Sequence, residues 1–246
     1  MKNFCISMTS IPPRFDGLEK TLNSLETQNK KTEKIFLNIP EKFNRFSTVE
    51  YDFNNLLKKF KNLKINKCED YGPGTKLIGS LGDIMEYDYV VLVDDDHVYK
   101  KEMLEIFYEQ ANKNLEASYS FCVYDILDCK IGQGADGFLI NTKHLKNILS
   151  FFNKHVKNNK RLIFNDDLWI SIYLNKILKI DIKSVFHFLK KPFFIKNKSI
   201  YKKHTQVGAI IETYSANRKM ARELKYKENC EEYLLLKNST NNFTNL

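Results

Sequence analysis

Short apolar runs alternate with amphipathic segments along the first hundred residues of the chain. Phe4–Met8 and Lys34–Ile39 are short and apolar, as buried strands usually are. Between them, Leu18, Leu22 and Leu25 recur at a spacing that places their side chains on one face of a helix. The pattern predicts strands at 4–8, 34–39, 63–67 and 89–93, and helices around residues 18–25, at 49–60 and at 75–86. This alternation predicts a mostly parallel sheet with helices on both faces.

The second half of the chain carries similar elements in a less regular order. We expect strands at 118–126, 138–141 and 180–188, and helices at 101–113, 143–156 and 166–178. The chain shows no internal repeat and no linker, so one α/β domain in two lobes is expected. Residues 190–208 are basic and follow no regular pattern, which predicts a mobile loop. The polar residues 238–246 are expected to fray.

The composition narrows the classes of protein to which the chain can belong. With 246 residues, of which 43% are hydrophobic and 13% aromatic, the chain can form one large folded domain and is not a disordered protein. The net charge of +9 favours anionic partners such as nucleotides, nucleic acid or an acidic membrane surface. A lysine-rich coding bias explains the charge equally well. Lysine is densest at residues 58–67, 190–203 and 218–227.

Cysteine spacing and targeting signals indicate the compartment. The five cysteines form no CxxC pair and no zinc-binding spacing with histidine. The N-terminus is too short and too polar for a signal peptide, and no apolar stretch reaches about 18 residues. We therefore expect a cytoplasmic protein that is either soluble or held at a membrane surface by its lysine clusters.

Three adjacent carboxylates, Asp94, Asp95 and Asp96, follow the predicted strand at 89–93. Open α/β sheets bind ligands at this end of their strands. Because side chains alternate along an extended chain, Asp94 and Asp96 can share one cation while Asp95 points elsewhere. Hard oxygen ligands suit Mg²⁺ or Mn²⁺, and phosphate oxygens commonly complete the coordination of such ions. The alternative interpretation is a solvated acidic turn.

A second pair of carboxylates, Asp166 and Asp167, begins the predicted helix at 166–178. Asn165 is a suitable N-cap for this helix, and acidic residues in a first turn favour the helix dipole. That structural role needs no catalysis. The functional alternative is that one of the two carboxylates acts as a general base on a hydroxyl group.

The segment at 68–76 is rich in turn residues and ends in a lysine. Gly72 and Gly74 permit a close approach of the backbone or a positive φ, and Lys76 can reach a phosphate. The spacing excludes a Walker motif, and a tight turn with an exposed lysine is the alternative interpretation.

Three of the histidines bear on a possible cation site. His97 directly follows the acidic triplet, where it either assists a bound cation or only marks a polar strand end. His187 lies in an apolar run and is expected in the core. His204, in the basic segment 190–208, is a candidate for contact with a metal or a diphosphate.

Five segments, taken in their order along the chain, resemble glycosyltransferases of the GT-A fold that are similar to family 2. They are residues 7–14 (Ser-Met-Thr-Ser-Ile-Pro-Pro-Arg), 70–77, 93–96 with the DXD motif, 134–138 and 166–174. The resemblance covers residues 4 to about 185. It implies a Rossmann-like mixed sheet flanked by helices. It also implies a domain at 1–237, with a nucleotide-binding lobe at 1–100 and an acceptor-side lobe at 101–237.

The resemblance implies a role for each matching residue. The residues that would bind the donor are Thr9, Ser10, Arg14, Asp70, Lys76, Asp94 and Asp95. The sugar and the acceptor would lie against Gly134, Ala135, Asp136 and Trp169. Asp94 and Asp96 would bind Mn²⁺ or Mg²⁺, with His204 as the candidate third protein ligand. Asp166 or Asp167 would accept the proton of the acceptor hydroxyl.

The expected activity is therefore metal-dependent transfer of a sugar from a nucleotide-sugar, with a UDP-sugar preferred, to a hydroxyl of a glycan or glycoconjugate. Inversion with a carboxylate base is expected. A nucleotidyltransferase is the first alternative, but it requires a glycine-rich basic loop after the first strand, where Ser10–Arg14 carries two prolines and no glycine. A nucleic-acid-binding protein is the second, and it is disfavoured because most aromatic residues lie within apolar runs. No nucleic-acid partner is expected.

Overall fold

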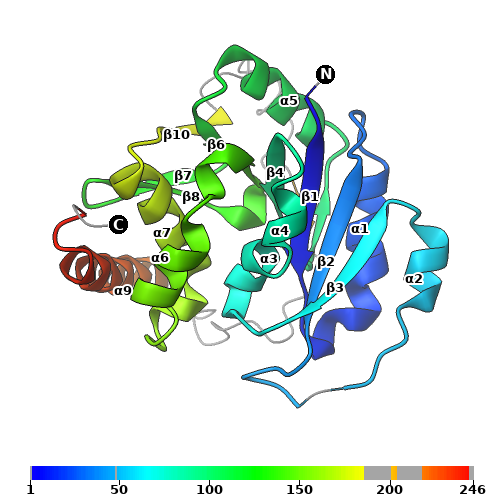
Figure 1. Ribbon diagram of the computed structural model, residues 1–246, viewed down its shortest axis with the longest axis horizontal. Coiled ribbons are helices and arrows are strands. Elements are labelled where there is room, and N and C mark those ends of the chain that lie inside the picture. The colour runs from blue at the N-terminus through cyan, green and yellow to red at the C-terminus, as the bar shows by residue number, and fades with distance from the viewer. Residues whose placement is uncertain (1, 48, 186–200, 204–217, 244–246) are drawn as a thin grey trace.

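The central sheet crosses the whole molecule (Figure 1). The computed structural model describes residues 2–47, 49–185, 201–203 and 218–243. The sheet strands are β1 (Phe4–Thr9), β2 (Lys34–Pro40), β3 (Leu63–Cys68), β4 (Tyr89–Leu92), β6 (Ser118–Ser120), β9 (Phe138–Asn141) and β10 (Ile182–Ser184). Within these residues the strand order is β10-β6-β9-β4-β1-β2-β3. β9 is antiparallel to β4 and β6, and the other pairs are parallel, so the sheet is mixed, as expected.

Two apolar cores cover the two faces of the sheet. One face packs against α1 (Leu18–Glu26), α2 (Asn54–Lys59) and α5 (Met103–Lys113). The other packs against α3 (Thr75–Ile78), α4 (Leu81–Ile84), α6 (Ile148–His155), α7 (Asp166–Ile172) and α9 (Arg218–Ser239). In β1, Ile6 and Met8 belong to the first core and Cys5 to the second, because successive side chains of a strand point to opposite faces. The predicted layering is confirmed, and strands from both predicted lobes share this sheet.

Two helices of the first half differ from the predicted ones. The helix predicted at 49–60 begins only at Asn54, because the aromatic rings of Tyr51 and Phe53 pack against Phe15 and hold the preceding backbone out of the helix. The helix predicted at 75–86 is divided into α3 and α4 near Gly79. A side chain at Gly79 would lie 2.9 Å from both Asn38 and Cys68, so distant parts of the chain pass too closely here for another residue.

The second half contains elements that the hydrophobic pattern merged or missed. The strand predicted at 118–126 is two strands, β6 and β7 (Val123–Ile126), and β7 pairs with β8 (Cys129–Gly132), which was not predicted. The helix predicted at 143–156 is a 3-10 turn, Thr142–Leu145, followed by α6. The helix predicted at 166–178 is α7 followed by a π-helical turn, Tyr173–Ile177.

A small strand pair joins the acidic triplet to a distant part of the chain. β5 (His97–Tyr99) is antiparallel to β11 (Tyr201–Lys203), with His97 opposite Lys203. His204 and His187 lie outside the described residues, as does the segment 190–208 apart from β11 and the predicted strand 180–188 beyond residue 185. Among described residues, α9 continues to Ser239 and Thr240 is buried, so the frayed tail predicted from residue 238 begins too early.

None of the described helices combines the length and the apolar character that a membrane crossing requires.

Candidate functional site

A cavity of about 370 Å³ opens at the carboxyl ends of β1 and β4. It is lined by Thr9, Ser10, Ile11, Arg14, Pro40, Phe43, Arg45, Phe46, Asp70, Gly72, Pro73, Lys76, Asp94, Asp95, Asp96, Phe164, Asp166 and Asp167. The residues that sequence reasoning assigned to donor binding therefore all lie in one cavity, together with the two candidate bases. Parallel strands bring these distant segments together because their carboxyl ends share one edge of the sheet.

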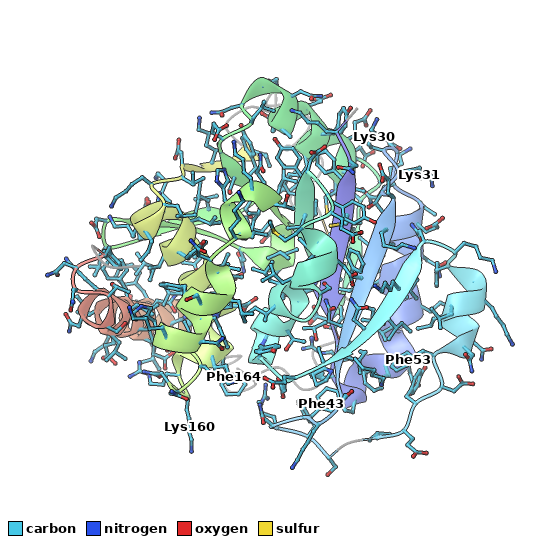
Figure 2. All side chains as sticks on the ribbon, in the orientation of Figure 1. Lys30, Lys31, Phe43, Phe53, Lys160 and Phe164 are labelled. Atoms are coloured by element: carbon cyan, nitrogen blue, oxygen red, sulfur yellow. The ribbon has the colours of Figure 1, made fainter. Side chains whose placement is uncertain are left out.

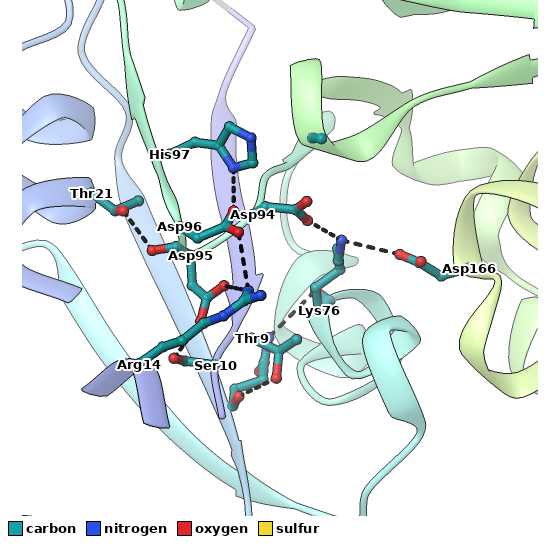
Figure 3. A network of polar contacts seen from close by, with 12 residues as sticks. Thr9, Ser10, Arg14, Thr21, Lys76, Asp94, Asp95, Asp96, His97 and Asp166 are labelled. Atoms are coloured by element: carbon teal, nitrogen blue, oxygen red, sulfur yellow. Dashed lines mark hydrogen bonds and ion pairs between the residues drawn. The ribbon is translucent and has the colours of Figure 1, made fainter. Parts of the chain in front are cut away.

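The acidic triplet is held by cationic and polar side chains rather than by solvent (Figure 3). The Asp94 carboxylate lies 2.5 Å from the Lys76 ammonium group. Asp95 accepts hydrogen bonds from the Ser10 hydroxyl and the Arg14 guanidinium, each at 2.6 Å. Asp95 and Asp96 are only 4% and 2% exposed. The alternative of a solvated acidic turn is therefore wrong.

Asp94, Asp96 and His97 together form a candidate cation site. Each offers one ligand atom, and these atoms lie within 4.8 Å of one another. Two carboxylate oxygens and an imidazole nitrogen suit Mn²⁺, and they leave coordination positions for the oxygens of a ligand. Asp96 also contacts the Nδ1 atom of His97 and lies 3.4 Å from Arg14. The sequence favoured His204 as the third ligand, whereas His97 completes the group among described residues.

Arg14 and Lys76 pair with carboxylates and offset part of the negative charge of this acid-rich cavity. Burial lowers the pKa of Lys76, but the nearby Asp166 and Asp94 carboxylates outweigh burial and raise that pKa well above its usual value. For Asp94, burial is again the largest effect, yet the ion pair with Lys76 outweighs it and lowers the pKa. Burial raises the pKa of Asp95 despite the opposing Arg14. Lys76 is thus a charged, fixed component of the site.

The position of Lys76 follows from local packing beneath α3. The backbone carbonyl of Lys76 accepts hydrogen bonds from the hydroxyl of Ser7 and, at 3.4 Å, from the amide of Asn38. Asn38 also donates to Ser7 at 2.9 Å, and both side chains are fully buried. Lys76 itself is 4% exposed, so the alternative of a tight turn with an exposed lysine is wrong.

The backbone geometry of the 68–76 turn explains why two of its residues are glycines. Gly72 has a φ of +62°, which a glycine adopts without strain. A side chain at Gly74 would lie 2.6 Å from the Trp169 ring. The turn is therefore pressed against α7, and this contact brings Lys76 to the carboxylates at the start of that helix.

Asp70 lines the cavity, but its carboxylate is engaged in holding two segments together. It accepts a hydrogen bond from the Gly72 amide at 2.8 Å and another from the Asn44 amide at 2.7 Å. These bonds pin residues 41–47 to the 70–74 turn. Both carboxylate oxygens of Asp70 thus have backbone partners within the protein, and its predicted contact with the donor stays a prediction.

Asn165 does not cap α7 as the sequence suggested. Its backbone carbonyl accepts the first helical hydrogen bonds, from Leu168 and Trp169, but its side chain makes no capping bond. The side-chain amide instead donates to Asn229 at 2.9 Å and to Glu232 at 2.6 Å, both in α9. Tertiary partners have replaced the local cap.

The two following carboxylates point into the cavity and differ in their partners. Asp166 lies 3.1 Å from the Lys76 ammonium group. Asp167 accepts a hydrogen bond from the Gly134 amide at 2.8 Å. Burial, reinforced by the neighbouring Asp166 charge, raises the pKa of Asp167 to about 8. A side chain at Gly134 would lie 3.1 Å from the Asp167 carboxylate, so glycine leaves this oxygen accessible.

None of the four residues predicted to face the sugar and acceptor lines the cavity. Gly134, Ala135 and Asp136 form a 3-10 turn beside it, and burial raises the pKa of Asp136 to about 6. Trp169 is fully buried, with its ring 5.3 Å from that of Phe152. It supports the 68–76 turn from below and has no surface for a sugar, so its predicted role is wrong.

Two features of the site were not predicted from the sequence, and the first is a group of aromatic residues around Arg45. Arg45 lies between the rings of Phe46 and Phe164, at 5.1 and 5.4 Å from their centres, on the cavity wall. Phe43 and Phe164 lie at the carboxyl ends of β1 and β2 (Figure 2). The sequence Phe-Asn-Arg-Phe at 43–46 was the available signal, because aromatic residues in a loop need a packing partner or a ligand.

The buried phenol of Tyr99 is the second missed feature. It accepts a hydrogen bond from the Asp94 amide at 2.9 Å and donates one to the Ala135 carbonyl at 3.1 Å. Tyr99 thereby joins the cation site to the 134–136 turn. Tyr99 ends a three-residue strand that the hydrophobic pattern does not predict, so nothing in the sequence indicated its role.

Similar proteins were found among solved structures only. No protein-family model and no curated protein matches the chain. S. aureus TarS 1–349 has a TM-score of 0.53 and 14% identity, over 98% of this chain and 72% of that one. The same fragment in complex with UDP-GlcNAc gives a TM-score of 0.53 at 14% identity, over 94% and 71%. Mannosyltransferase PcManGT from Pyrobaculum calidifontis, in complex with GDP-Man and Mn²⁺, gives 0.52 at 11% identity, over 74% and 54%.

These similarities concern the fold. The predicted GT-A-like architecture, a mixed sheet flanked by helices, is confirmed by them. The chain spans 55% of a TarS 1–349 structure with UDP and 37% of a longer TarS structure. The sequence identities are too low to carry function from those proteins to this one.

Proposed function

We propose that the protein is a glycosyltransferase that binds a nucleotide-sugar through a divalent cation and transfers the sugar to a hydroxyl group. One observation carries the proposal. A single cavity joins Asp94 and Asp96, which form a candidate cation site with the adjacent His97, to the buried cation Lys76 and to the carboxylates Asp166 and Asp167. These are the parts needed to hold a diphosphate and to activate a hydroxyl beside it.

In this proposal, residues 1–100 bind the donor and residues 101–237 bind the acceptor, a glycan or glycoconjugate. Thr9, Ser10 and Arg14 contact the nucleoside and a phosphate, and Asp94 and Asp95 take part in binding the ribose. The aromatic end of the cavity, with Phe46, receives the base. A UDP-sugar is the first candidate, because the TarS fragment similar to this chain was crystallised with UDP-GlcNAc.

The cation would be held by Asp94, Asp96 and His97, and Mn²⁺ or Mg²⁺ fits this donor set. His204 stays a further candidate ligand, because β11, the strand directly before it, pairs with β5. When bound, the cation would supply positive charge to the departing diphosphate. Lys76 adds a second charge nearby, and burial fixes it in place before the reaction begins.

Asp167 is the carboxylate that we assign as the base. Asp166 is engaged with Lys76, whereas Asp167 has only a backbone amide among its closest polar contacts. A base works best when its pKa lies near the working pH, and a pKa of about 8 meets this condition. Deprotonated Asp167 would accept the proton of the acceptor hydroxyl, which then attacks the sugar and inverts its configuration.

The proposal is tested first by ligand binding. The melting temperature of the protein is measured with UDP and with GDP, each with and without Mn²⁺. A ligand that binds the folded state raises this temperature, so a rise that requires both Mn²⁺ and a nucleoside diphosphate is expected. In the variant Asp94→Ala/Asp96→Ala, Mn²⁺ and the nucleoside diphosphate should no longer raise the melting temperature. The matched control removes two exposed carboxylates, Asp125→Ala/Asp181→Ala, and should still show the rise.

The products then identify the reaction. A glycosyltransferase releases a nucleoside diphosphate, whereas a nucleotidyltransferase releases pyrophosphate. Absence of any response to nucleoside diphosphates would refute the proposal. Peripheral attachment to acidic membranes through the lysine clusters stays a prediction, which co-sedimentation with anionic vesicles tests.

A further inference from the structure

Three consecutive residues at the start of α7 contact three different parts of the molecule. Asn165 reaches α9, Asp166 reaches Lys76, and Asp167 reaches the amide of Gly134. Because the three residues share one short stretch of backbone, the position of each side chain depends on the contacts of the other two. The contact with α9 is the one that points away from the cavity.

The α9 side of this contact is a buried polar cluster. Asn229 and Glu232 are 3% and 6% exposed, and both accept a hydrogen bond from the Asn165 amide. The other oxygen of Glu232 lies 3.5 Å from Arg161, four residues before Asn165. One turn further on, Leu236 is fully buried in the core shared with α7. Figure 1 shows α9 beside α6 and α7, at the edge of the molecule.

A local cap would have stabilised α7 with less polar burial. An asparagine at this position can bond to the free amides of its own helix. Here its amide is used on α9, and two further polar side chains must be buried to receive it. Burying polar groups is costly unless all are satisfied, and such clusters fix geometry more than they add stability.

We propose that Asn229 and Glu232 are positioning residues for sugar transfer, which hold Asn165 and thereby fix the carboxylates of Asp166 and Asp167 in the cavity. This inference rests on the proposed function. Neither residue touches the cavity, so their effect should appear in the rate of transfer and not in the binding of the donor.

The test reverses the direction of one hydrogen bond. In Asn165→Asp, a carboxylate faces Glu232 and the donating amide is lost. In Asn165→Asp/Glu232→Gln, the new amide at 232 donates to the new carboxylate at 165, and the Asn229 side-chain amide turns to present its NH2 group instead of its oxygen, so both contacts are restored with opposite polarity. The control is Glu231→Gln, which alters an exposed carboxylate on the same helix that also pairs with Arg161.

Asn165→Asp should lower kcat at least about tenfold, equivalent to about 1.4 kcal/mol in the barrier, while the KM of the donor stays within about twofold. The double variant should recover kcat to within about threefold of the wild type. Glu231→Gln should have wild-type kinetics.

Two results would overturn the inference. One is an Asn165→Asp variant with the kcat of the control. The other is a double variant that regains the melting temperature of the wild type but not its kcat, because the contact would then serve stability alone. Failure of the proposed function is distinguishable, since the wild type itself would then neither bind a nucleoside diphosphate with Mn²⁺ nor transfer a sugar.

Discussion

Replacing Asp167 with asparagine should make the protein more stable at neutral pH while strongly slowing sugar transfer. Asparagine retains an oxygen that can accept the hydrogen bond from the Gly134 amide, and it carries no charge. In the wild type, burial and the Asp166 charge raise the pKa of Asp167 from 3.8 to about 8. The folded state therefore holds a proton that the unfolded chain releases between these two values.

The sign and size of the effect follow from proton linkage. Because the folded pKa is raised, the stability contributed by protonated Asp167 is fully present below about pH 4 and is lost as the pH rises towards 8. One proton changes the free energy of unfolding by at most about 1.4 kcal/mol per pH unit, or about 2.7 kcal/mol between pH 5 and pH 7. This is an upper figure, because water in the cavity favours the charged carboxylate.

The assay compares melting temperatures of the wild type and Asp167→Asn at pH 5 and pH 7, with EDTA and without nucleotide. For a chain of this length the linkage term corresponds to a relative shift of roughly 5 to 10 °C at most, with Asp167→Asn gaining as the pH rises. Asp136, with a pKa of about 6, titrates in both proteins and cancels in the difference. The control is Asp181→Asn, which alters an exposed carboxylate, and its melting temperature should change with pH as that of the wild type does.

The reasoning is refuted if the difference between the two melting temperatures is the same at both pH values. In activity assays, kcat/KM of the wild type should rise nearly tenfold per pH unit below pH 7 and level off above about pH 8, because the base must lose its proton. The asparagine variant should lose a factor of about 10² to 10⁴.

Three further predictions concern the walls of the cavity. Lys76→Met should destabilise the protein by about 2 to 4 kcal/mol in urea denaturation, because it leaves the buried Asp166 and the partly exposed Asp94 without their shared cation. An effect below about 1 kcal/mol would contradict a fixed ion pair. Asp96→Ala should weaken Mn²⁺ binding at least about tenfold in titration calorimetry with UDP present, and unchanged affinity would exclude Asp96 as a ligand. Gly74→Ala should lower the free energy of unfolding by about 1 to 3 kcal/mol, because its new methyl group would meet Trp169. The control Gly82→Ala, which has open space around it, should not lower it. Equal melting temperatures of the two variants would disprove the close contact.

The parts of the fold that depend on local pattern could be predicted from the sequence. Helix α1 follows from the periodicity of its one buried face, and the strands around Ile6 and Val91 follow from short apolar runs, because both of their faces are buried. The acidic triplet could be placed at the ligand-binding edge of the sheet because it directly follows a predicted strand. The division of the 75–86 segment into two helices could not be predicted, because the close approach at Gly79 involves residues distant in sequence.

The parts that depend on distant partners could not be predicted. Asn165 fits the pattern of a cap, but its actual partners lie more than sixty residues further along the chain. Trp169 has the helical spacing of a core residue and the chemistry of a sugar platform, and only its burial decides between them. The strand β5 is three residues long and exists because β11 pairs with it, so no local periodicity marks it.

The pairing of β5 with β11 and the contact of Asn165 with α9 also affect the order in which the site forms during synthesis. All residues that line the cavity lie at or before Asp167, whereas the elements that hold His97 and Asn165 follow at 201–203 and 218–239. A chain growing from its N-terminus therefore contains the full set of lining residues well before it can fix them. Domains fold as units during synthesis, so cation binding should be acquired late, after most of the sheet has formed. A truncated product that ends before residue 201 would carry every cavity-lining side chain and would still lack the elements that hold His97 and Asn165.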